Sequence, residues 1–107
     1  MEKVYIMLCC GAGISSGLIA QKTKKAAKAK KIDVTVEARS ESEVAEYFSY
    51  IDILLLGPHY AAQKDEFAEQ AKPFNVPVIV VPSDIYGKMD GERLLDLALK
   101  TVEENKK

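Results

Sequence analysis

The sequence predicts an α/β fold: an open, four-stranded parallel sheet in the order 2-1-3-4, with helices on both faces. Short apolar segments alternate with segments of helical periodicity along the 107 residues, which favours a parallel sheet. Two apolar segments, DILLLG and PVIVVP, are continuous, as expected of strands buried on both faces. With 48% hydrophobic and 29% charged residues, the chain has a globular composition, so we expect residues 1–107 to form one domain.

Strands are expected over residues 3–9, 34–38, 52–56 and 77–81. The second strand differs from the others because its apolar residues, Val34, Val36 and Ala38, alternate with polar ones. This alternation places the second strand at an edge of the sheet. Right-handed crossovers then give the order 2-1-3-4, with a topological switch point at the carboxyl end of the first strand, where open α/β sheets bind ligands.

Helical periodicity marks the segments between and after the strands. The first helix is expected over residues 14–31, and its small side chains would let it lie close to the sheet. Ser40 and Glu43 form a capping-box pattern that predicts the start of the second helix. The expected core-facing residues are Ile19, Thr23, Ala26 and Ala27 in the first helix, Val44, Tyr47 and Phe48 in the second, Tyr60, Phe67, Ala68 and Ala71 in the third, and Leu94, Leu95, Ala98 and Val102 in the fourth.

The segment CCGAGISS after the first strand is the candidate site. Gly11 and Gly13 remove side-chain bulk, so the backbone N–H groups of residues 11–16 can converge on one anion at the positive end of the first helix. The same field stabilises a thiolate, which makes Cys10 a candidate nucleophile. We therefore predict Cys10 as the catalytic residue and a phosphate-binding loop of Gly11, Ala12, Gly13, Ile14, Ser15 and Ser16.

The neighbouring Cys9 has a different expected role. Successive strand side chains point to opposite faces, so Cys9 is expected to pack as a small hydrophobic residue. The chain has no apolar segment long enough to cross a bilayer and no cleavable leader, which favours a cytoplasmic location. A disulfide between adjacent cysteines is not expected in that reducing compartment, because a vicinal bridge requires strained geometry.

Other phosphate-binding loops do not match this segment. A Walker A loop requires a lysine after its last glycine, but Leu18 follows Gly17, and a dinucleotide loop beginning at Gly11 would require a glycine in place of Ser16. One histidine and one adjacent cysteine pair do not make a zinc ligand set, so we expect neither a metal nor an organic cofactor.

The closest alternative is a cysteine phosphatase or arsenate reductase of the low-molecular-weight tyrosine phosphatase type, which has a nucleophilic cysteine at the same place in a similar sheet. Those enzymes use a Cys-x5-Arg-Ser loop whose arginine grips the phosphoryl oxygens. Here Ser16 is the sixth residue after Cys10, and no arginine is close in sequence. A phosphocysteine in this loop would lack that charge stabilisation for hydrolysis, which suits a carrier. A non-catalytic anion-binding regulatory module is a further alternative.

A lysine-rich face on the first helix raises the question of a nucleic-acid partner. The formal net charge is -1 and the face has no interleaved aromatic residues, so we expect no nucleic-acid binding. If this face docks a partner, an acidic protein surface is the better candidate. The sequence leaves open whether a partner contacts His59, Tyr86 or this face, whose lysines are Lys24, Lys25, Lys28 and Lys31.

Three segments carry a resemblance to a known family. LCCGAGISS after the first strand, LLGPH after the third and YGKMDG before the last helix resemble the lactose/cellobiose-type IIB component of the bacterial phosphoenolpyruvate-dependent sugar phosphotransferase system. The resemblance covers essentially the whole chain, and the cysteine loop is its most specific part. In the family pattern the nucleophile immediately precedes a small-Ala-Gly segment, which matches Cys10 and residues 11–13.

The resemblance implies a phosphoryl relay. A phosphohistidine on a IIA partner donates to the IIB cysteine, which passes the group to a sugar held by the membrane IIC transporter, with the IIB component docking at the inner face of the membrane. The subfamily suggests a β-linked disaccharide such as cellobiose, lactose or chitobiose. Gly11 and Ser16 depart from the related cellobiose component, as does Cys9, which stands where that protein has a bulky apolar residue. The backbone role of the loop does not depend on these side chains.

Overall fold

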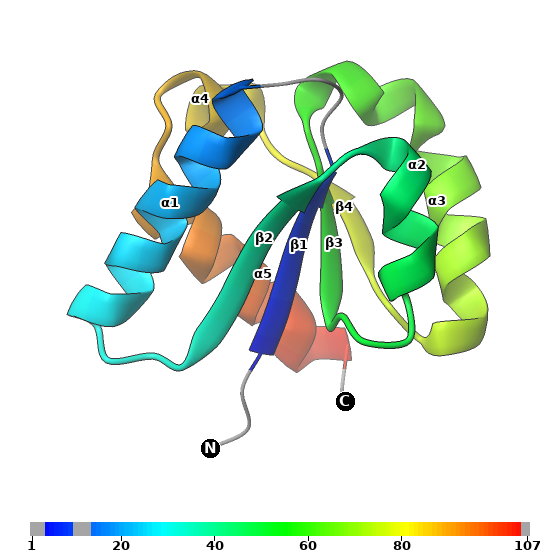
Figure 1. Ribbon diagram of the computed structural model, residues 1–107, viewed down its shortest axis with the longest axis horizontal. Helices are drawn as coiled ribbons and strands as arrows, with labels where there is room; N and C mark the ends of the chain where they lie inside the picture. Colours follow the sequence, from blue (N-terminus) through cyan, green and yellow to red (C-terminus); the bar gives the residue numbers. More distant parts are fainter. Residues whose placement is uncertain (1–3, 10–13, 106–107) are drawn as a thin grey trace.

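Four parallel strands form one open sheet in the order β2-β1-β3-β4 (Figure 1). The computed structural model describes residues 4–9 and 14–105. The strands are β1 (Val4–Cys9), β2 (Val34–Arg39), β3 (Ile53–Leu56) and β4 (Val78–Val80). The predicted order is confirmed, with β2 at one edge.

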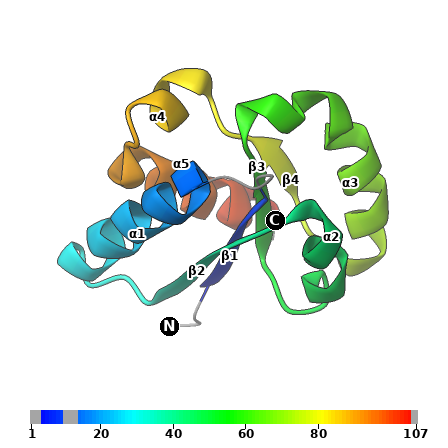
Figure 2. The same cartoon turned by 45° about the horizontal axis from the view of Figure 1, so that its top comes forward.

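Helices cover both faces of this sheet (Figures 1 and 2). One face carries α1 (Ile14–Ala29), α4 (Ser83–Gly87) and α5 (Gly91–Asn105). The other face carries α2 (Glu41–Val44) and α3 (Lys64–Ala71), together with the short 3₁₀ helices η1 (Ala45–Tyr47), η2 (Pro58–Gln63) and η3 (Lys72–Phe74).

The two faces have separate hydrophobic cores that share the central strands. In β1, Ile6 and Leu8 belong to the core beneath α1 and α5, whereas Met7 and Cys9 belong to the core beneath α2 and α3. In β3, Ile53 and Leu55 belong to the first of these cores, and Leu54 and Leu56 belong to the second. These side chains are fully buried, because alternate residues of a strand point to opposite faces and helices cover both.

The outer strand β4 differs from the expectation of burial on both faces. Val78 is buried, but Ile79 and Val80 are only half-buried. The reason is topological: β4 is the second edge of the sheet, so its side chains have a neighbouring strand on one side only.

The helices also differ in detail from the sequence-based expectation. The first helix ends at Ala29, not residue 31, because Lys31 adopts a positive φ of 58° and Ile32 donates its N–H to the carbonyl of Ala27 at 2.9 Å. This 6→1 bond is a Schellman-type helix end. The second helix begins after Ser40 as predicted, but the Ser40 side chain makes no capping hydrogen bond. The short helix α4 was not predicted.

The two long helices on the first face, α1 and α5, pack in close contact at Gly91. A Cβ atom built on Gly91 would lie 2.4 Å from the carbonyl carbon and 2.5 Å from the carbonyl oxygen of Lys22, both backbone atoms of α1. A side chain of any size is therefore excluded here unless the helices separate. The position of α5 against α1 depends on this glycine.

We expect Gly91→Ala to lower the free energy of unfolding by about 1–3 kcal/mol, because the added methyl group would push two packed helices apart. Urea unfolding followed by circular dichroism measures the change. Gly87→Ala is the matched control, since a Cβ there meets nothing within 4 Å and its effect should stay within about 0.5 kcal/mol. Equal stabilities of the two variants would contradict this account of the helix contact.

Candidate functional site

The predicted site lies at the carboxyl edge of the sheet, between the end of β1 at Cys9 and the start of α1 at Ile14. The predicted nucleophile and the first three positions of the predicted loop, Cys10, Gly11, Ala12 and Gly13, lie outside the described residues. What the structure describes is the surface on either side of them.

The start of α1 supplies one side of the site. Ile14, Ser15 and Ser16 form its first turn, and the side chains of these three residues lie outside the described part of the chain. In a helix the first-turn N–H groups have no acceptor within the helix, and the axial dipole adds partial positive charge there. Helix N-termini with these properties bind anions in proteins, and an anion site at residues 14–16 stays a prediction.

The strands β1, β3 and β4 all end at this edge of the sheet. The N–H of Gly57, directly after β3, donates to the carbonyl of Cys9 at 3.1 Å, and the N–H of Val81, directly after β4, donates to the carbonyl of Leu56 at 2.8 Å. The segments Gly57-Pro58 and Pro82-Ser83 thus leave the sheet at the same edge as β1, as expected from the topology, and Gly57 is directly beside its end.

The sequence also left open whether a partner contacts His59 or Tyr86. His59 belongs to η2 at this edge, but its side chain lies outside the described residues. Tyr86 is 9% exposed and lies in the core shared by α1, α4 and α5. Its ring therefore contributes to the packing of this core.

Cys9 is fully buried in the core beneath α2 and α3, which confirms the packing role predicted for it. Its neighbours there include Val44, Phe48 and Leu56. A thiol with no solvent-accessible surface is shielded from other molecules, which argues against Cys9 as a reactive group.

Arg39 is a charged residue near the site that sequence reasoning missed. It is the register partner of Cys9 across the β1–β2 ladder, although the two are 30 positions apart in the chain. Its guanidinium group pairs with Glu37 at 2.8 Å and lies 5.4 Å from the ring centre of Tyr47. The Nε atom is buried and has no hydrogen-bond partner among the described residues. The parallel pairing of two strands that end at one edge was the available signal.

The pair formed by Glu37 and Arg39 is completed by Tyr5, whose hydroxyl donates to Glu37 at 2.5 Å. This donated hydrogen bond is the largest cause that lowers the pKa of Glu37, and Arg39 lowers it further. Burial and the same hydrogen bond raise the pKa of Tyr5 to about 12. Arg39 is therefore held by an ionised carboxylate at neutral pH, which partly cancels its charge at the edge.

A hollow of about 270 Å³ lies beside this edge, between α1 and β2. Its lining includes Gly17 and Lys24 of α1 and Arg39 of β2. It is the cavity adjacent to the candidate site.

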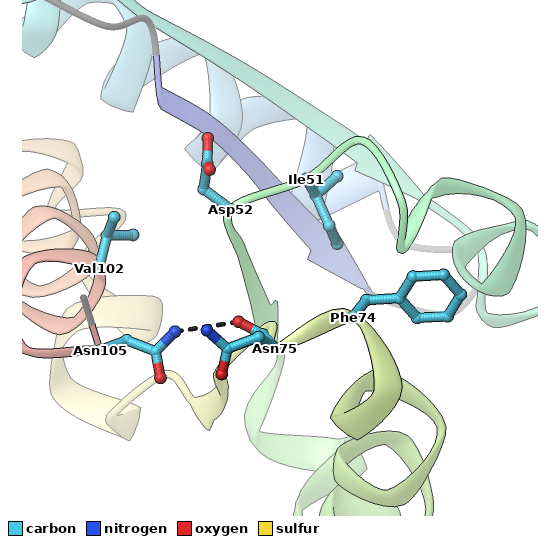
Figure 3. A pocket seen from close by; sticks show the side chains of 6 residues that line it. All are labelled: Ile51, Asp52, Phe74, Asn75, Val102 and Asn105. Atoms are coloured by element: carbon cyan, nitrogen blue, oxygen red, sulfur yellow. Dashed lines mark hydrogen bonds between the residues drawn. The ribbon is translucent and has the colours of Figure 1, made fainter. Parts of the chain in front are cut away.

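A second cavity, of about 220 Å³, lies at the opposite end of the sheet (Figure 3). Asp52 and Asn75 line it just before β3 and β4 begin, and the side-chain amide of Asn105 donates to the carbonyl of Asn75 at 3.0 Å. The carboxylate of Asp52 is engaged by the N–H of Tyr5 at 2.8 Å. This cavity is at the amino ends of the strands and does not belong to the candidate site.

Within residues 4–9 and 14–105, no group of three or more histidine, cysteine, aspartate or glutamate residues is placed to hold a metal ion. The same residues include no helix that is long and apolar enough to cross a membrane.

Comparison with known proteins gives consistent matches over nearly the full chain. Residues 5–97 match the family model described as "PTS system, Lactose/Cellobiose specific IIB subunit". The galactose-specific and cellobiose-specific EIIB components of Lactococcus lactis are each 35% identical over 103 residues, which cover 92% of this chain and 95% of each relative. The solution structure of the cellobiose-specific IIB component of Borrelia burgdorferi has a TM-score of 0.82 and 34% identity, over 97% of this chain and 95% of that one.

We expect Tyr5→Phe to raise the pKa of Glu37 toward its ordinary value, because the variant removes the largest cause that lowers it. The lowered pKa of Glu37 adds stability above the unfolded-state value, and that stability is lost as the pH falls through the folded-state value. The variant should therefore lose less stability than the parent between about pH 5 and pH 3.

NMR titration of the Glu37 carboxyl carbon measures the pKa, and urea unfolding at several pH values measures the stability. Tyr50→Phe serves as the control, because Tyr50 is exposed. Among the described residues, its ring contacts the ring of Tyr47 and no other ring. An unchanged Glu37 titration in Tyr5→Phe would contradict the assigned hydrogen bond.

Proposed function

Because the chain belongs to the lactose/cellobiose-specific IIB family of the sugar phosphotransferase system, we propose that it carries a phosphoryl group on Cys10, received from a phosphohistidine of a IIA protein and passed to a sugar held by a membrane IIC transporter. Members of this family are phosphotransferase components. The residue, the covalent intermediate and the order of transfer are the proposal.

One observation carries the assignment to Cys10. The strand β1 is fully buried from Ile6 to Cys9, and its last carbonyl is already bonded to Gly57, so the residue after Cys9 is the first that can leave the sheet. The first turn of α1 follows four residues later. A thiolate or phosphoryl group between them would lie near unpaired helix N–H groups, which favour negative charge.

The first transfer is an in-line displacement at phosphorus. The Cys10 thiolate attacks, a P–S bond forms, and the P–N bond to the donor histidine breaks, with the electron pair returning to the imidazole nitrogen. The N–H groups of residues 11–16 balance the charge on the three phosphoryl oxygens. The donor histidine supplies the leaving group, and this chain supplies the nucleophile and the anion site.

The second transfer reverses the role of the cysteine. A sugar hydroxyl attacks the phosphorus, its proton leaves to a base, a P–O bond forms, and the P–S bond breaks to return the thiolate. We propose a β-linked disaccharide such as cellobiose, lactose or chitobiose as the sugar. The reaction would take place in the cytoplasm, at the inner face of the membrane, where the IIC transporter holds its substrate.

The loop suits retention of the phosphoryl group between the two transfers. A phosphatase of similar fold would place an arginine within the loop, whereas Arg39, the register partner of Cys9, is on β2 and already paired with Glu37. Water attack on the phosphocysteine therefore lacks a dedicated cation to stabilise the transition state.

We expect phosphoenolpyruvate, the general phosphotransferase proteins and a IIA protein to add one phosphoryl group to this chain, at Cys10. Intact-mass measurement and peptide mapping at neutral to alkaline pH locate it. Cys10→Ser should carry none of this label. Cys9→Ala is the matched control and should retain the label, because Cys9 is buried in the core.

Each other result points elsewhere. Rapid hydrolysis of an aryl phosphate by the isolated chain would favour a phosphatase, and arsenate reduction an arsenate reductase. No label under a working relay would favour a regulatory anion-binding module, and a label on His59 would contradict the assignment of the residue.

A second expectation concerns the accessibility of the two thiols. Iodoacetamide should add one group to the folded chain, at Cys10, and a second only after unfolding in urea, because Cys9 has no exposed surface. Intact mass measured before and after urea gives the count. Modification of Cys9 at the same rate as Cys10 in the folded chain would contradict the division of roles between them.

A further inference from the structure

The exposed side of α1 is a concentrated basic surface beside the candidate site. We define the α1 basic surface as the exposed residues Leu18, Gln21, Lys22, Lys24, Lys25 and Lys28. The helix Ile14–Ala29 contains no acidic residue, although the whole chain has a formal net charge of -1. This helix therefore carries four lysines and no carboxylate, although the chain as a whole is close to neutral.

Nearby acidic side chains neutralise little of this surface. On α5, Asp96 and Glu92 pair with Lys30, just beyond the helix end, at 3.2 and 3.7 Å. Glu37 of β2 interacts with Lys24 but is bonded to Tyr5 and Arg39. Within residues 4–9 and 14–105, Lys22, Lys25 and Lys28 make no ion pair.

The same surface also has an exposed apolar side chain and an adjacent cavity. A helix face that only contacts solvent requires neither. Leu18 is 45% exposed and lies one turn before Lys22 and two turns before Lys25, on one stripe of the helix. Next to this stripe, the hollow of about 270 Å³ between α1 and β2 has the small residue Gly17 in its wall and Lys24 at its rim. A protruding side chain of a partner can enter there.

The position of the surface relates it to the phosphoryl group. The helix α1 begins at the carboxyl edge of the sheet and forms an outer flank of the molecule, and no helix or strand of residues 4–9 and 14–105 packs on its outer side (Figures 1 and 2). Leu18 is in the second turn of this helix, so a protein that reaches the candidate site from this flank would lie along the lysine stripe.

We propose that the α1 basic surface docks an acidic surface of the protein that donates the phosphoryl group, with carboxylates facing Lys22 and Lys25 and an apolar side chain against Leu18. The inference rests on the proposed phosphoryl relay and specifies the chemistry of the donor's contact surface. Opposite charge at the rim of an interface speeds encounter and sets orientation, while a small apolar contact limits dissociation.

Two other polyanions fit this surface less well. Nucleic acid is disfavoured because the surface has no aromatic residue on which bases could stack, and the chain is not basic overall. An anionic membrane surface is disfavoured because Leu18 is the only large apolar side chain on the exposed side of α1 in the described residues, too little to insert into a bilayer.

The test compares two pairs of lysine substitutions that remove the same net charge. Lys22→Gln with Lys25→Gln changes the docking surface. Lys72→Gln with Lys100→Gln changes exposed lysines on η3 and α5, outside the α1 basic surface. We expect the first pair to reduce kcat/KM for transfer from the phosphorylated IIA protein of a lactose/cellobiose-type system by about 3- to 10-fold at low salt, and less at 0.5 M salt. The second pair should have no more than about a twofold effect.

Binding of the unphosphorylated IIA protein, followed by calorimetry, gives a readout that does not depend on phosphoryl transfer. The first pair, and separately Leu18→Ser, should raise Kd by about 3-fold or more. Loss of labelling at Cys10 in the parent chain, with IIA binding still sensitive to Lys22 and Lys25, would refute the relay and leave the docking surface standing. Equal effects of the two lysine pairs would overturn the proposal. It would also be overturned if the substitutions at Lys22 and Lys25 weakened binding of this chain to phosphatidylglycerol vesicles or RNA and left its binding to the IIA protein unchanged.

Discussion

The burial of the central strands on both faces is the constraint on which the rest of the structure depends. Ile6, Met7, Leu8 and Cys9 are all fully buried, yet they belong in turn to two different cores. A strand with both faces covered has no surface on which to do chemistry, so reactive groups can appear only where it ends. The proposal of Cys10 as the reactive residue therefore rests on the burial of β1 as much as on the chemistry of sulfur.

Hydrogen bonds at both ends of the sheet keep these strand ends in register. At the carboxyl edge, Gly57 and Val81 extend the backbone ladder one residue beyond the strands. At the amino edge, Tyr5 and Asp52 exchange two bonds of 2.8 Å, one through the Asp52 carboxylate. Because each tie joins neighbouring strands at their ends, the loops that leave the carboxyl edge start from fixed points. The proposed transfer site, which two partners would enter in turn, would benefit from such a rigid frame.

Charge is arranged unevenly around this frame. On β2, the edge strand, Glu37 and Arg39 form a compact pair capped by Tyr5 and Tyr47, which places alternating charge along an otherwise exposed edge. The lysines of α1 make no ion pair among the described residues, and Lys30, just beyond the helix end, pairs with α5. The same chain therefore neutralises its charge where strands could pair wrongly, and leaves it uncompensated on the flank beside the candidate site.

The sequence by itself determined the period of each element and hence the α/β class, the strand order, the edge position of β2 and the packing role of Cys9. These depend on local patterns: alternation in a strand, breakers at its ends and glycines after it. Tertiary structure alone decided the rest. The pairing of Arg39 with Cys9 joins residues 30 positions apart, and the half-burial of Ile79 follows from having one neighbouring strand. The contact between Gly91 and the α1 backbone joins two helices that are not consecutive in the chain. Such contacts depend on which elements lie side by side, and no local pattern in a single sequence encodes the distance between them.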